Sequence, residues 1–149
     1  MARRFEELEV WQESRKLTRR IYALTQETSV KRDWDLCRQI RRAAVSVMSN
    51  IAEGFERGST KEFVHALYVA RGSAGEVRSQ LYIIMDVTPH DRETIVVLQN
   101  DYASLSRRIW SLIRYLQQRS DSTAVREGEG EYTIPADSSG SWGCDEPVP

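Results

Sequence analysis

The clearest indication of the fold lies between Ser59 and Ile84, where the sequence reads STKEFVHALYVARGSAGEVRSQLYII. Its apolar residues recur at alternating steps of four and three: Phe63, Leu67, Ala70, Ala74, Val77, Leu81 and Ile84. This spacing keeps one seam of an α-helix facing its neighbours. The opening Ser59-Thr60-Lys61-Glu62 matches a capping box, in which the serine hydroxyl accepts from the amide three residues on and the glutamate reaches back. The stretch therefore predicts a long, core-facing helix over residues 60–87.

Three further stretches show helical periodicity, and they lie on both sides of the first. Residues 34–57 carry the seam Leu36, Ile40, Ala43, Val47 and Ile51, and Gly58 follows where a glycine would stop the helix. Residues 8–28 carry Val10, Leu17, Ile21 and Leu24 on one side. Residues 89–119, after a predicted cap at Thr88–Asp91, carry Ile95, Leu98, Tyr102, Leu105, Ile109, Leu112 and Leu116. Short connections between helices of this length predict an all-α, antiparallel up-down-up-down four-helix bundle over residues 1–119.

The charge is distributed unevenly along the 149 residues, although the net charge is only −1. Residues 1–120 hold 20 lysines and arginines against 15 acidic residues, whereas residues 121–149 hold one arginine against seven acidic residues. Helical periodicity also ends near Ser120, and the glycine-, serine- and acid-rich remainder cannot bury enough apolar surface to offset ordering. We therefore expect residues 120–149 to be a disordered acidic tail on a basic body.

Neither a membrane segment nor a cysteine framework is expected. The chain has no run of about 18 apolar residues, and its N-terminus turns acidic at Glu6 where a signal peptide would be apolar. These features predict a cytoplasmic protein with no membrane partner. Cys37 and Cys144 share no disulfide or metal spacing, and Cys37 is expected to pack as a small apolar residue.

No candidate for catalysis or metal binding meets the requirements of its chemistry. Glu62 and His65 have the Glu-x-x-His spacing of di-iron bundles, but no second copy exists and Glu62 belongs to the capping box. A glycine-framed serine elbow and a phosphate-binding glycine loop are both missing from the sequence. Paired acid catalysis by Glu53 and Glu76 is disfavoured, because nearby arginines would keep both ionised. We expect no enzyme activity, no cofactor and no metal.

A polar stripe on the helix over residues 34–57 calls for an explanation. Gln39, Arg42, Ser46, Asn50, Glu53 and Arg57 follow the spacing of the core positions but are all polar. The stripe is either a solvated face or a hydrogen-bonded network at a helix or subunit interface, with Glu53 and Glu76 as acceptors for Arg42 or Arg71. Gly72 and Gly75 lie inside a helix at a penalty of about 1 kcal/mol each, which suggests close packing within or between subunits.

Basic residues predict a surface for nucleic-acid phosphates. Arg15, Lys16, Arg19 and Arg20 form two rows at i, i+4 spacing on the first helix, and cationic residues of the second and fourth helices add to them. Acidic residues are interspersed, and no base-reading motif is present. The candidate RNA- or DNA-binding residues are Arg15, Lys16, Arg19, Arg20, Arg38, Arg41, Arg107, Arg108 and Arg114.

Four segments resemble one known family: residues 5–11 (FEELEVW), 41–54 (RRAAVSVMSNIAEG), 59–63 (STKEF) and 70–76 (ARGSAGE). The chain resembles, over about residues 5–118, the four helix bundle proteins encoded in intervening sequences of bacterial 23S rRNA genes. It is similar, more distantly, to the accessory variability protein of diversity-generating retroelements. The link over residues 27–34 lacks the Phe-Pro that family members often carry, and the tail after Ser120 has no family counterpart.

The resemblance implies a left-handed antiparallel bundle that assembles as a homopentamer, has no known catalytic activity and associates with nucleic acid. Matched to the family's signature, seven polar residues read as a packing or assembly network: Arg42, Ser46, Asn50, Glu53, Arg71, Ser73 and Glu76. We expect a homopentameric bundle that binds structured RNA or DNA through its arginines. The alternative is a protein-binding adaptor whose acidic tail contacts a basic partner, such as a reverse transcriptase.

Overall fold

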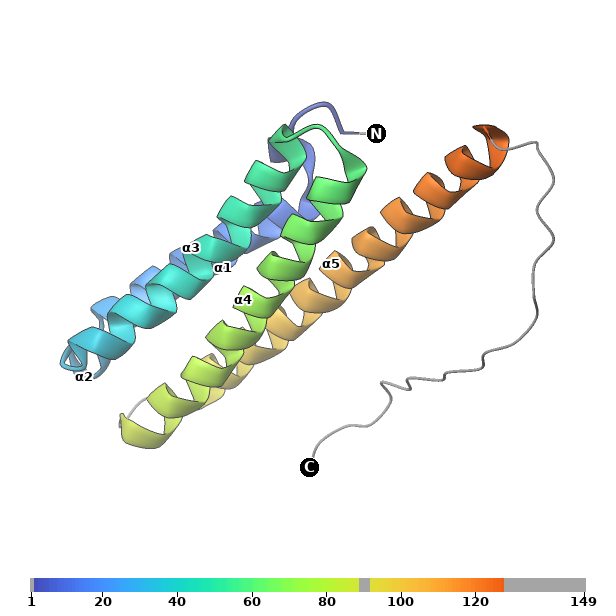
Figure 1. Cartoon of the computed structure of the whole chain (residues 1–149). Coiled ribbons are helices and arrows are strands. Elements are labelled where there is room, and N and C mark those ends of the chain that lie inside the picture. The colour runs from blue at the N-terminus through green and yellow to red at the C-terminus, as the bar shows by residue number, and fades with distance from the viewer. Residues whose placement is uncertain (1, 89–91, 128–149) are drawn as a thin grey trace, which may run out of the picture.

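The computed structural model describes residues 2–88 and 92–127, which are almost entirely helical. Four long helices follow one another: α1 (Glu9–Gln26), α3 (Trp34–Glu56), α4 (Thr60–Val87) and α5 (Arg92–Glu127). The α3–α4 connection lies at one end of the molecule, and the last turn of α4 and the first turn of α5 lie at the other (Figure 1). The helix α3 packs on α1 and α4, while α5 packs on α4 and α1, which closes a four-membered ring. The predicted antiparallel four-helix bundle is therefore confirmed.

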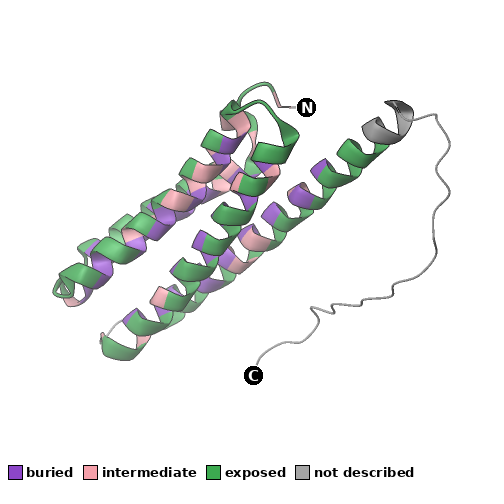
Figure 2. Cartoon of the chain, in the orientation of Figure 1, coloured by how far each residue is buried: buried purple, intermediate pink, exposed green. Residues whose placement is uncertain are grey.

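The core consists of the predicted seams, whose buried residues face inward between the helices (Figure 2). All seven predicted positions of α4, from Phe63 to Ile84, are buried, as are all five of α3. One position of α5 differs, because Ile113 is fully buried and Leu112 only half-buried. A strict 3.5-residue repeat drifts relative to the 3.6 residues per turn of a straight helix, so the seam of α5 needs one extra residue by its fifth turn.

The connection between α3 and α4 is built as the sequence predicts. Gly58 adopts the left-handed φ of 80° that ends a helix without a Cβ clash. The Ser59 hydroxyl accepts from the Glu62 amide at 3.2 Å and donates to the Glu62 carboxylate at 2.9 Å. The Glu62 carboxylate thus contacts the serine hydroxyl, whereas in a standard capping box it would accept from the serine backbone amide.

Two boundaries differ from the prediction. The link after α1 contains a short helix, α2 (Thr28–Lys31), which buries Val30 against the core. Helix α5 continues through Ser120 to Glu127, so the expected end at Arg119 is wrong. The sequence has no glycine or proline before Gly128 in this segment, and extending an existing helix requires no new nucleation. Residues 117–122 are all exposed. The predicted disorder of 128–149 and the cap residues 89–91 lie outside the described residues.

Candidate nucleic-acid interface

A groove of about 730 Å³ opens between the C-terminal half of α1, α2 and the N-terminal half of α3. We call it the basic groove, because its walls carry four cationic side chains and, among the described residues that line it, no Asp or Glu. The cations are Lys31, Arg38, Arg41 and Arg42. Three large apolar side chains at least one third exposed also line it: Tyr22, Trp34 and Val45.

Two of these arginines are positioned by aromatic rings. The Arg41 guanidinium carbon lies 4.6 Å from the ring centroid of Tyr22, and its Nε donates to the Thr25 hydroxyl at 2.7 Å. The Arg38 guanidinium carbon lies 5.3 Å from the centroid of Trp34. Both distances are within the range of cation–π attraction, which is about 0.5–1 kcal/mol at exposed sites. The aromatic rings therefore hold the guanidinium groups in place at the groove.

Trp34 is 66% exposed, more than any other large hydrophobic side chain among the described residues. It is the first residue of α3, directly after the N-cap Asp33, whose carboxylate accepts from the Leu36 amide at 3.0 Å. This position orients Trp34 away from the helical seam that Leu36 begins. The indole is therefore presented at the rim of the groove on a capped and fixed helix end.

Cys37 forms part of the groove floor and carries no reactive thiol. Its side chain is buried, and Sγ donates to the Val30 carbonyl oxygen at 3.3 Å. Burial raises the pKa of Cys37, so the thiol stays protonated at neutral pH. Cys37 packs among the core residues as a small apolar group, as the sequence predicts.

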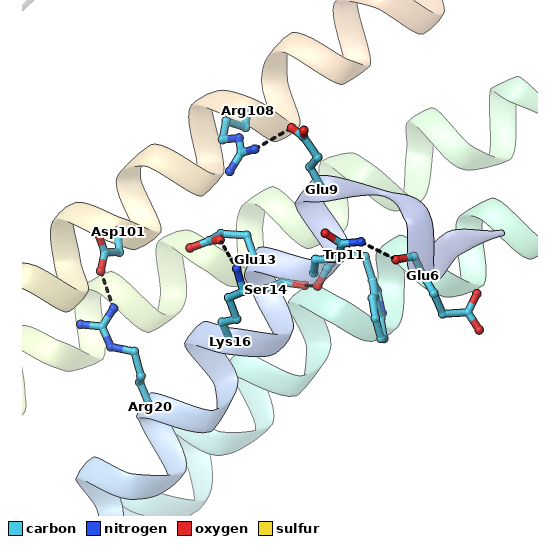
Figure 3. Close-up of polar contacts among 10 residues, drawn as sticks. Glu6, Glu9, Trp11, Glu13, Ser14, Lys16, Arg20, Asp101 and Arg108 are labelled. Carbon is cyan, nitrogen blue, oxygen red and sulfur yellow. Dashed lines mark hydrogen bonds and ion pairs between the residues drawn. The ribbon is translucent and has the colours of Figure 1, made fainter. Parts of the chain in front are cut away.

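The structure divides the cationic residues predicted on α1 into two groups. Arg15, Lys16 and Arg19 are exposed on its outer side, and Arg15 and Arg19 lie seven and three residues before Tyr22, along the same side of the helix. Arg20 instead pairs with Asp101 of α5, as Figure 3 shows. The row of cations leading into the groove therefore consists of Arg15 and Arg19, whereas Lys16 pairs with Glu13 at 3.8 Å (Figure 3).

The arginines of α5 lie away from the basic groove. Arg108 pairs with Glu9 of α1 at 2.7 Å (Figure 3). Arg107 and Arg114 are exposed on α5, which packs on α1 and α4, diagonally across the ring from α3. The nine predicted cations therefore do not form one surface. The sequence did not indicate Tyr22, Lys31 and Trp34 as residues of the groove. Trp34 could have been found, because it is an aromatic residue in the first turn of a predicted helix and lies off the apolar seam.

Part of the predicted polar network exists within one subunit, between α3 and α4. The hydroxyl oxygens of Ser46 and Ser73 lie 2.9 Å apart, and the Asn50 amide donates to the Ser46 hydroxyl at 3.0 Å. The predicted pairing of Glu53 and Glu76 with Arg42 or Arg71 is not found among the described residues of one subunit, and such a pairing between subunits stays a prediction. Glu53 pairs with Arg57 at 2.7 Å. In the described chain neither Arg42 nor Arg71 forms an ion pair with Glu53 or Glu76, and Arg71 covers the ring of Trp110 at 4.8 Å.

The other exposed hydrophobic side chains of the described residues lie on α4 and α5 but do not form one surface: Tyr68, Val69, Tyr82, Ile83, Val87, Val96, Val97, Trp110 and Tyr115. Val69 borders a pocket with residues of α3, and Val87 borders another pocket with Trp34. We call the part around Tyr68, Tyr82 and Trp110 the α4–α5 face, where the rings of Tyr68 and Trp110 meet edge to face with 6.1 Å between their centroids. Gly72 and Gly75 are exposed on the same side of α4, in a stripe of four- and three-residue steps from Tyr68 to Tyr82. A Cβ built on either glycine meets no atom within 4 Å. No contact within the subunit therefore requires a glycine at these positions.

These features define a small four-helix bundle protein with a basic groove on one side and an apolar face on another. The description "23S rRNA-intervening sequence protein" matches residues 6–111, and the chain belongs to that family. It is also similar to the crystal structure of a protein of unknown function from the S23 ribosomal protein family of Bacteroides thetaiotaomicron. The TM-score is 0.65 at 24% identity, over 70% of this chain and 95% of that one. No curated protein sequence matches the chain. In its described residues, no helix is long and apolar enough to cross a membrane.

Proposed function

We propose that the protein is a non-catalytic, cytoplasmic homo-oligomer, a pentamer by its family resemblance, that binds structured RNA or DNA through the basic groove. The observation that carries this proposal is the groove itself, where four cations line a cavity with no carboxylate among the described lining residues. Phosphate neutralisation by Lys and Arg dominates nucleic-acid affinity. Arg15 and Arg19 extend the cationic surface along α1, so that a backbone of several phosphates can follow it.

Assembly of several copies would combine their grooves, and the α4–α5 face supports it. The exposed rings of Tyr68 and Trp110 meet there, and exposed aromatic side chains that cluster in this way are typical of interaction sites. Gly72 and Gly75 weaken α4 by up to about 1 kcal/mol each relative to alanine. Since nothing inside the subunit requires them, a second copy whose backbone approaches closely at α4 accounts for both glycines.

The nucleic-acid proposal is tested by measuring affinity for a structured RNA across a range of salt concentrations. The slope of log K against log salt is about −0.7 to −0.9 for each phosphate contacted. We expect a steep slope for the full chain and a slope shallower by about one or two for Arg38→Ala/Arg41→Ala. Arg107→Ala/Arg114→Ala, which removes the same charge from α5, is the matched control and should change little. Affinity that does not respond to salt contradicts the proposal.

The assembly proposal is tested by the mass in solution, which should be a multiple of the 17.2 kDa of one chain. A second class of function, an adaptor for a partner such as a reverse transcriptase, would use the same apolar face for a different protein. A single-chain mass that rises only when a reverse transcriptase is added would favour the adaptor and reject the homo-oligomer.

A further inference from the structure

The basic groove contains more than phosphate contacts require. Phosphate binding needs only cations and hydrogen-bond donors, yet the groove also exposes Trp34 and Tyr22 beside its arginines. An exposed tryptophan in a small cytoplasmic protein has an unfavourable contact with water. Aromatic rings interleaved with arginines are instead typical of sites where bases stack and phosphates are bound together.

The dimensions of the groove fit one nucleotide with its flanking phosphates. Its volume of about 730 Å³ lies inside the range of about 300–1,000 Å³ that small-molecule pockets span. Arg38 covers part of the Trp34 ring, and the 66% exposure leaves the indole accessible to a further planar group. The buried Thr25 and Cys37 close the floor, so a base entering between Tyr22 and Trp34 would be desolvated on more than one side.

We infer that the basic groove takes an unpaired nucleotide, such as one in a loop or bulge, with its base stacked on Trp34 and its flanking phosphates on Arg38 and Arg41. The inference rests on the proposed nucleic-acid function and names the form of nucleic acid that it requires. In a duplex, the base faces are covered by their neighbours, so Trp34 has no base on which to stack. Unpaired bases are the ones that proteins stack on aromatic side chains and arginine planes.

The test uses the full-length protein and one RNA strand of about ten nucleotides of mixed sequence, free or annealed to its complement. We expect tighter binding to the single strand than to the duplex. Trp34→Ala should weaken single-strand binding about five- to 150-fold, the range of one base–aromatic stack, and leave duplex binding unchanged. Trp34→Phe should restore affinity, while the quenching of tryptophan fluorescence by the single strand should be lost.

Tyr115→Ala is the matched control, because Tyr115 is an exposed aromatic residue beside an arginine, Arg119, and lies outside the groove and on another side of α5 from Trp110 of the α4–α5 face. It should leave single-strand affinity unchanged, and circular dichroism should show all variants folded. Equal affinity for strand and duplex, with no effect of Trp34→Ala, overturns the inference and leaves the proposed function standing. Failure to bind either form rejects both. If a mononucleotide competes as effectively as the single strand, the inference is overturned in favour of a small-molecule site.

Discussion

Three glycines of the bundle have opposite roles, and replacing each by alanine separates those roles. Gly54 lies where α3 crosses α4, and a Cβ there would fall well inside contact distance of the Ala66 Cβ and 3.3 Å from the Phe63 ring. Gly72 and Gly75 have open space where a Cβ would stand. All three are helical residues, so the change in intrinsic helix propensity is the same and only the surroundings differ.

The magnitudes follow from these surroundings. Alanine is better than glycine in a helix by up to about 1 kcal/mol, so Gly72→Ala/Gly75→Ala should raise the free energy of unfolding of an isolated subunit by about 1–2 kcal/mol. In the assembly, the two added methyl groups would separate the helices that meet there, so the subunits should dissociate. Gly54→Ala adds a methyl group where the core has no room, which costs about 1–3 kcal/mol and outweighs the gain in propensity.

The assay combines urea unfolding followed by circular dichroism with mass measurement by light scattering, both at several protein concentrations. We expect Gly72→Ala/Gly75→Ala to have a smaller mass in solution than wild type. At concentrations where both proteins are single chains, we expect the variant to have the larger free energy of unfolding. An unchanged mass would refute the placement of a subunit interface at α4. A loss of stability in the isolated subunit would refute the open surroundings of Gly72 and Gly75, and a stable Gly54→Ala would refute the close helix crossing.

Three further predictions concern the body of the bundle. Tyr102→Phe should raise the free energy of unfolding by about 1 kcal/mol, because the buried hydroxyl lies beside Thr18 but forms no hydrogen bond of normal geometry in the described residues; a loss of similar size contradicts this. Alkylation of Cys37 in the native protein should stay slow at pH values where an exposed thiol reacts, because burial raises the pKa of Cys37 and keeps its thiol in the unreactive protonated form. Peptide mass mapping should show rapid modification of Cys37 once the protein is unfolded in urea. A double-mutant cycle on Arg20 and Asp101 should give a coupling of about 0.2–1 kcal/mol, since both side chains are about 40% exposed, and a value near 3 would mean that the pair is effectively buried.

The bundle could be predicted from the sequence because its determinants are local. The seam from Phe63 to Ile84, the Ser59 cap and the Gly58 stop each follow from spacing and conformational preference within a few residues. The errors have two different causes, a tertiary contact in the link after α1 and the geometry of the helix itself in α5. Val30 packs into the core, and the polar link around it forms the short helix α2. In α5, the buried position near the end of the seam is Ile113, because a straight helix drifts from the heptad repeat.

The candidate site could be predicted only in part. Arg38 and Arg41 were expected to bind nucleic acid, but their aromatic partners come from the start of α3 and the end of α1 and meet only when the helices pack. Neighbouring arginines of one helix differ in their surroundings, since Arg19 is exposed whereas Arg20 pairs with Asp101, which lies 81 residues further along the chain. The four helices and their buried faces follow from the amino-acid sequence alone, because periodicity and capping act over a few residues. Which cations share a groove depends on contacts between helices, and the spacing of residues within one helix does not specify those contacts.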